Sequence, residues 1–189
     1  MAKMQDRVLL GVISGLGGGL VKNAVSELLI RKNLAEYGGP ARAAGMLVPA
    51  HKITTSRGRL VGWLADTTIS GMLGVASVYA LSFTGKEKAP LKGALIGGIT
   101  AWTALYGALG TMGVTQVQDP APKTVLSEFL AHAVYGAVTA SIATALGDEG
   151  LFNGQIPWTP IGLRQLDVDP TSSSRQTTKY KIQRRYVTF

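Results

Sequence analysis

The chain has 189 residues, of which 46% are apolar and 16% are charged, and its net charge is +8. A soluble domain would have about a quarter of its residues charged, and the lack of cysteine excludes disulfides, thiolate metal sites and cysteine nucleophiles. The charges are confined to a few stretches that separate long apolar segments, a distribution typical of an integral membrane protein.

Four predominantly apolar stretches are each long enough to cross about 30 Å of hydrocarbon. We therefore predict an all-α fold, with an integral membrane four-helix bundle over residues 1–147. The first stretch follows Lys3 and Arg7, as a signal peptide would, but its length and its internal Lys22 favour a retained helix. The predicted spans lie near residues 8–30, 60–84, 93–115 and 125–146.

The connections between these spans differ in kind. Residues 31–59 form a long basic loop with glycine and proline breakers, and its piece 41–48 is suited to lie along the membrane interface. Residues 85–92 and 116–124 are short enough to join antiparallel neighbours. Residues 148–189 are polar and contain prolines, which predicts a poorly ordered basic tail.

The last fifteen residues of this tail carry five cations and no acid. They are either solvated or lie on anionic lipid headgroups, at about 1 kcal/mol per cation near the surface, or they contact a protein partner. Because the other basic residues flank apolar spans, we predict the lipid bilayer as the partner and no binding of nucleic acid. The residues assigned to lipid or partner contact are Arg175, Lys179, Lys181, Arg184 and Arg185.

Four spans would place both termini and the 85–92 turn on one side of the membrane. That side holds eleven lysines and arginines, whereas the other side holds seven. Cytoplasmic loops carry the excess of these residues, so we predict a multi-pass protein with cytoplasmic N- and C-termini.

Small or polar residues recur at intervals of four in the spans, which places them along one slowly drifting face of each helix. Glycines on such a face let two backbones approach closely in lipid. We expect this packing to serve the bundle, a homo-oligomer or a larger membrane complex. The helix-packing glycines are Gly11, Gly15, Gly19, Gly62, Gly74, Gly93, Gly97 and Gly136.

The spans also contain a cluster of polar and ionisable residues, all in the membrane half that faces the long loop. At 1.5 Å per residue, Glu27 and Glu128 lie about 5 Å below the membrane boundary, and Lys22, Asp66 and His132 lie about 10 Å below it. We predict that they converge in one intramembrane polar cluster. Its members are Lys22, Asn23, Glu27, Asp66, Glu128 and His132.

A charge at the bilayer centre costs about 2.5–3.5 kcal/mol even on permissive scales, so such residues persist only if they pair, hydrate or function. In one interpretation, the cluster is a proton or ion relay, or a site for transport of a small solute. In the alternative, Lys22 pairs with Asp66 or Glu128, and Glu128 hydrogen-bonds to His132. The charges then form a helix-packing lock in a structural or partner-binding subunit. The sequence leaves both interpretations open.

Enzymatic chemistry has weak support in the sequence. The chain has no Gly-x-Ser-x-Gly motif. Glu128 and His132 offer two ligands on one helix face, but a metal site needs at least a third. We therefore predict no catalytic residues, no metal and no cofactor.

Short motifs recur in the spans and next to them. Their residues are Gly11, Gly15, Lys22, Glu27, Lys92, Gly93, Gly97, Pro120 or Pro122, Ser127, Glu128, His132, Tyr135 and Gly136. These motifs resemble those of the YagU-like group of small bacterial inner-membrane proteins and their relatives. The resemblance covers about residues 5–147, and Asp66 departs from the pattern of the group. It implies a four-helix protein of the bacterial cytoplasmic membrane, with no particular biochemical activity.

Overall fold

The computed structural model describes residues 3–101 and 120–154, together with residues 103, 104, 106, 112, 114 and 117. In this part of the chain all regular structure is helical, apart from an isolated bridge between Met4 and Gly147. The helices are α1 (Arg7–Arg31), α2 (Gly39–Leu47), η1 (Ala50–Lys52), α3 (Ser56–Thr84), α4 (Ala89–Ala101), α6 (Pro122–Leu146) and η3 (Glu149–Phe152).

Three of these helices, α1, α3 and α6, are long and apolar enough to cross a membrane. They contain 25, 29 and 25 residues, so at 1.5 Å per residue each exceeds about 30 Å of hydrocarbon. The prediction of an all-helical chain is confirmed for the described residues, and three predicted spans coincide with these helices. The fourth predicted span, 93–115, begins within α4, and much of its second half lies outside the described residues.

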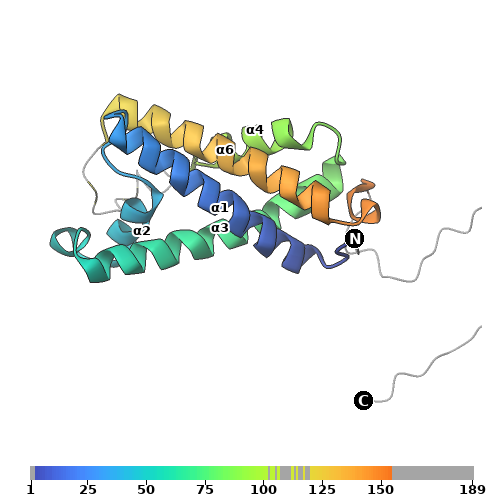
Figure 1. Cartoon of the computed structure of the whole chain (residues 1–189), viewed down its shortest axis with the longest axis horizontal. Helices are drawn as coiled ribbons and strands as arrows, with labels where there is room; N and C mark the ends of the chain where they lie inside the picture. The colour runs from blue at the N-terminus through green and yellow to red at the C-terminus, as the bar shows by residue number, and fades with distance from the viewer. Residues whose placement is uncertain are drawn as a thin grey trace, which may run out of the picture. The chain divides into compact units, whose positions relative to one another are not determined.

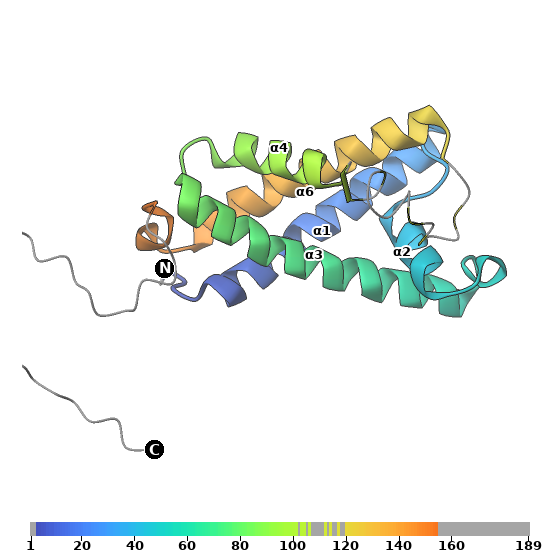
Figure 2. The same cartoon turned by 180° about the vertical axis from the view of Figure 1, so that it is seen from behind.

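The long helices pack side by side. Figures 1 and 2 show α1 between α3 and α6, with α4 lying along α6 and α2 at one end of the helices. At this end α1 finishes while α3 and α6 begin, and we call it the polar end. The opposite end contains the start of α1, the end of α3 and η3.

The helix surfaces are inverted relative to those of a soluble bundle, which would turn its large apolar side chains inward. Met72 and Leu126 are 68% and 69% exposed, whereas Ser14 and Thr139 are fully buried. A surface of exposed leucine, isoleucine and methionine around a small-residue interior fits contact with lipid.

Glycines set the distance between the helices. A Cβ added at Gly74 of α3 would lie 2.2 Å from the carbonyl oxygen of Gly11 on α1, and one added at Gly136 of α6 would lie 1.9 Å from that of Gly93 on α4. Such contacts leave no room for a side chain, so backbone packs on backbone. The structure places all eight predicted packing glycines at contacts between helices: Gly11, Gly15, Gly19, Gly62, Gly74, Gly93, Gly97 and Gly136.

The end opposite the polar end has an apolar core. Leu10, Val78 and Leu81 are buried there with Leu151 and Phe152. Two backbone hydrogen bonds, each 2.9 Å long, join Met4 to the end of α6, one to the carbonyl of Leu146 and the other from the amide of Asp148. The packed structure therefore continues past residue 147, where the sequence predicted the tail to begin.

A surface ion pair adds to this end. The ammonium of Lys86 hydrogen-bonds to Glu149 and lowers the pKa of this carboxyl below its ordinary value. Both side chains are well exposed, and a pair of this kind contributes little to stability.

The loop between α1 and α3 is more structured than the sequence predicted. Its piece 41–48 falls largely within α2, which packs on α3, where a Cβ added at Gly62 would lie 2.1 Å from the carbonyl oxygen of Pro40. The hydroxyl of Thr55 accepts the amide of Gly58 at 3.1 Å and caps α3. This cap explains why α3 begins four residues before the predicted span.

Candidate functional site

The segment after α1 attaches directly to the start of α6. The carbonyl of Leu34 accepts a hydrogen bond from the Ser127 hydroxyl at 2.9 Å, and the amide of Glu36 donates to the Thr124 hydroxyl at 3.1 Å. These contacts fix the approach of the chain to α2. α2 follows at the polar end, where it packs on α3.

The first buried ion pair joins α1 to α3. The ammonium of Lys22 donates to Oδ1 of Asp66, and Nδ2 of Asn23 donates to Oδ2 at 2.9 Å. Lys22 and Asp66 are both buried. A Cβ added at Gly39 would lie 2.7 Å from the Lys22 nitrogen and 2.6 Å from Asp66 Oδ1. The first residue of α2 therefore covers the pair, and glycine leaves it the necessary space.

The second buried ion pair joins α2 to α6. The guanidinium of Arg42 binds the carboxylate of Glu128 through two hydrogen bonds, Nε to Oε1 at 3.1 Å and a terminal nitrogen to Oε2 at 2.9 Å. Both residues are only 4% exposed. A planar guanidinium and a carboxylate match each other in this two-bond geometry, which is among the stronger interactions between side chains.

Two tyrosines surround this second pair. The Arg42 guanidinium lies 5.3 Å from the ring centroid of Tyr37 and 4.9 Å from that of Tyr106. It also donates to both hydroxyls, at 3.2 and 3.1 Å, and the Tyr106 hydroxyl donates to Glu128. Arg42 is thus held by a carboxylate and two aromatic rings.

Among the described residues, the four buried charges cancel. Lys22 and Arg42 supply two positive charges, and Asp66 and Glu128 supply two negative ones. Each ion pair connects two different helices, so together they tie α1 to α3 and α2 to α6. We refer to these four residues as the charge network.

His132 lies beside the charge network, one turn after Glu128 on α6. Its Nδ1 is 2.8 Å from the carbonyl oxygen of Glu128. Because this oxygen can only accept, the geometry assigns the proton to Nδ1. The ring is close enough to Lys22, Asp66 and Glu128 to interact electrostatically with all three. Tyr135, further along α6, donates to the carbonyl of Ser70 at 2.6 Å.

The structure leaves Glu27 out of the buried ion pairs, although it lines a cleft together with Asn23. Its side chain is 56% exposed and accepts a hydrogen bond from Arg31 at 2.8 Å. Residues spaced by four drift about 40° per step around a helix of 3.6 residues per turn. The series from Gly11 to Glu27 therefore drifts about 160° from its start, and its last member turns out of the buried interior. The other predicted members, Lys22, Asn23, Asp66, Glu128 and His132, do come together.

Arg42 is the residue that sequence reasoning missed. It was counted as a loop cation, although it is surrounded by Ala41, Ala43 and Ala44, the kind of small residue that forms helix contacts. Charge balance was a second signal, because the spans contain three carboxylates and one lysine. A search for the missing cation would have led to this alanine-rich segment.

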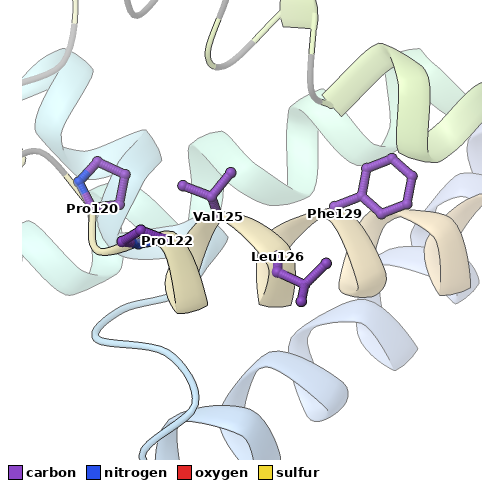
Figure 3. Close-up of a pocket in the computed structure, with 5 residues that line it drawn as sticks. All are labelled: Pro120, Pro122, Val125, Leu126 and Phe129. Atoms are coloured by element: carbon purple, nitrogen blue, oxygen red, sulfur yellow. The ribbon is translucent and has the colours of Figure 1, made fainter.

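A separate apolar groove of about 560 Å³ lies at the start of α6. Figure 3 shows Val125 and Phe129 on one side of the helix and Leu126 on another, with two prolines at its start. The described residues of its lining are all apolar, so they offer an ionic substrate no charged side chain. The lining residues are Pro120, Pro122, Val125, Leu126 and Phe129.

Two further predictions concern metals and the tail. Within the described residues, no three histidine or acidic side chains lie close enough together to hold a metal ion. The predicted contact residues Arg175, Lys179, Lys181, Arg184 and Arg185 lie outside the described residues, so their contact with lipid or a partner stays a prediction.

Comparison with protein-family models, curated proteins and solved structures finds no significant match to this chain. The resemblance to the YagU-like group therefore stays a prediction from the sequence motifs. Function has to be inferred from the geometry of the polar end.

Proposed function

We propose that this chain is a multi-pass protein of the bacterial cytoplasmic membrane with a four-helix membrane bundle. Three of its spans are α1, α3 and α6, and the other begins with α4. Both termini lie in the cytoplasm. The charge network is a helix-packing lock, and the chain acts as a structural or partner-binding subunit of a membrane complex.

The complete pairing of the buried charges carries this proposal. Asp66 and Glu128 are each held by a cation and a further donor. Both carboxylates are therefore used in contacts that hold the bundle together. The network also joins helices that are distant in sequence, as a lock must.

The test compares Glu128→Gln with Glu149→Gln, since both carboxylates form ion pairs but only Glu128 is buried. For a lock, E128Q lowers the yield of folded protein and of any complex purified from native membranes, whereas E149Q leaves both unchanged. Equal effects of the two variants would contradict the lock.

A proton or ion relay is the second candidate, and the position of His132 beside the charge network favours it. Reconstitution in proteoliposomes distinguishes the two functions. A relay requires a pH-dependent flux in the wild-type chain that His132→Gln abolishes without loss of folded protein. A lock predicts no flux above that of empty liposomes.

A further inference from the structure

A cleft of about 710 Å³ opens at the polar end, between the last turns of α1, the segment before α2 and the first turns of α3. The charge network lies beside it, because Asn23, which binds Asp66, lines the cleft. Its lining combines carboxylates, one arginine and aromatic rings. The lining residues are Asn23, Ser26, Glu27, Ile30, Glu36, Tyr37, Gly38, Pro40, Ala41, Ile53, Thr54, Arg59 and Trp63.

Several residues that line this cleft carry hydrogen-bond acceptors with capacity to spare. Oδ1 of Asn23 is buried and has no partner among the described residues. Glu27 uses Oε1 to bind Arg31, and Glu36 binds the amide of Ala121 through Oε2 at 3.4 Å. Each of these carboxylates therefore has a second oxygen for a ligand. A buried amide oxygen beside two carboxylates is suited to a group with several N–H donors and a positive charge.

The cleft also contains a positive group. Arg59 lines it and forms no ion pair among the residues that the structure describes. Guanidinium groups bind phosphate oxygens in a planar, two-bond geometry. Acceptors for an ammonium and a donor for a phosphate thus occur in one cleft.

A smaller apolar groove of about 180 Å³ adjoins this cleft and shares Asn23 and Trp63 with it. The groove lies between α1 and α3, where Leu16 and Leu20 are exposed. Trp63 is itself 47% exposed and lies within the first turns of α3, which suits an aromatic residue at the membrane interface. A ligand that occupied both hollows would have a charged head and an apolar chain.

We propose that the cleft and the groove together bind one phospholipid with a primary amine in its headgroup, of the phosphatidylethanolamine class. Its ammonium binds Asn23 Oδ1, Glu27 and Glu36, and its phosphate binds Arg59. One acyl chain passes Trp63 and lies in the groove between α1 and α3. This site requires the membrane location proposed above, but it is independent of whether the charge network is a lock or a relay.

The chemistry of the cleft selects among lipids. A choline headgroup has no N–H to donate to the acceptors, and a purely anionic headgroup would bring negative charge toward Glu27 and Glu36. A primary amine joined to a phosphate satisfies both kinds of group in the cleft.

The test is native mass spectrometry of the full chain in detergent, with equal amounts of phosphatidylethanolamine, phosphatidylcholine and phosphatidylglycerol. We expect at least fivefold more of the ethanolamine lipid bound than of either other lipid. Arg59→Gln and Glu36→Gln should each remove this preference. Arg57→Gln, two residues before Arg59 and outside the cleft lining, and Glu149→Gln, at the opposite end, should retain it.

Equal binding of the three lipids, or a preference that survives both cleft variants, would overturn the proposal. Free phosphoethanolamine should displace the lipid only in large molar excess, and displacement at equal concentrations would show a soluble ligand instead. Extraction of membranes with alkaline carbonate tests the membrane location independently of the lipid site. A chain that resists extraction but binds lipids equally contradicts only the lipid site, whereas a chain released by carbonate contradicts the membrane location.

Discussion

At the scale of single residues, the charge network has an asymmetric energetic role. Burying two ions costs free energy that their mutual attraction only partly offsets, so a buried pair adds little net stability. Removing one partner is costly, by about 3–5 kcal/mol, because the other charge stays buried without compensation. Lys22, Asp66, Arg42 and Glu128 should all behave in this way.

Asp66→Asn tests this asymmetry in the first pair. The variant leaves the buried ammonium of Lys22 without a counter-charge, so we expect a loss of about 3 kcal/mol or more in the free energy of unfolding. Unfolding of the purified chain in mixed micelles by increasing detergent measures it. Glu149→Gln is the control, because its carboxylate is in an exposed pair with Lys86 and should change stability by less than about 0.5 kcal/mol. A D66N variant as stable as E149Q would contradict the buried pair.

At the scale of helices, the close backbone contacts depend on glycine at particular positions. Gly71 and Gly74 lie on the same helix, one turn apart. A Cβ added at Gly74 would lie 2.2 Å from the Gly11 carbonyl oxygen, whereas at Gly71 the nearest atom lies 4.0 Å away, on Leu16. Of these two glycines, only Gly74 is therefore needed for the contact of α1 with α3.

We expect Gly74→Ala to destabilise the chain by about 1–3 kcal/mol, because the helices must separate to admit the methyl group. Gly71→Ala should be neutral, or stabilising by up to about 1 kcal/mol, since alanine reduces the freedom of the unfolded chain. Thermal unfolding in detergent compares the two variants. A similar melting temperature for both would show that the close approach of α1 and α3 is not required.

The same packing explains which features of the fold could be predicted from the sequence. Three of the apolar spans and the glycine positions could be predicted, because apolar composition and close packing each leave a signal in a helix. The pairing of Lys22 with Asp66 was among the predicted alternatives, since both residues lie at matching depth in adjacent spans. The position of Arg42 could not be predicted by depth, because α2 returns toward the helices from a connecting loop. Glu27 was misplaced because a spacing of four does not stay on one face.

At the scale of the whole molecule, residues just after α6 belong to the packed unit. Leu151 and Phe152 are buried in the apolar core, so truncation after Gly147 should cost about 3 kcal/mol or more through the loss of these side chains. Truncation after Gly154 retains both and should leave the melting temperature unchanged. Equal melting temperatures of the two truncated chains would contradict the packing of η3.

The longer truncated chain also tests the basic tail. If the tail binds anionic lipid, this truncated chain should bind less than the full chain to vesicles with phosphatidylglycerol.

The chain has no cysteine, so single cysteines can report its orientation in intact cells. With four spans and cytoplasmic termini, Lys88→Cys in the short connection before α4 should resist a membrane-impermeant maleimide. Lys52→Cys in the segment before α3 should react with it. The opposite pattern would reverse the orientation, and labelling of both positions would contradict a crossing by α3.

The most direct test of the central claim is a double-mutant cycle on Arg42 and Glu128, because this contact joins a loop segment to the interior of the helices. Unfolding free energies are measured in mixed micelles for R42M, E128M and the double variant. The geometry predicts that each single substitution costs about 3–5 kcal/mol and that the double variant recovers most of this loss. Additive effects of the two substitutions would show that Arg42 and Glu128 do not interact, and the lock would have to be abandoned.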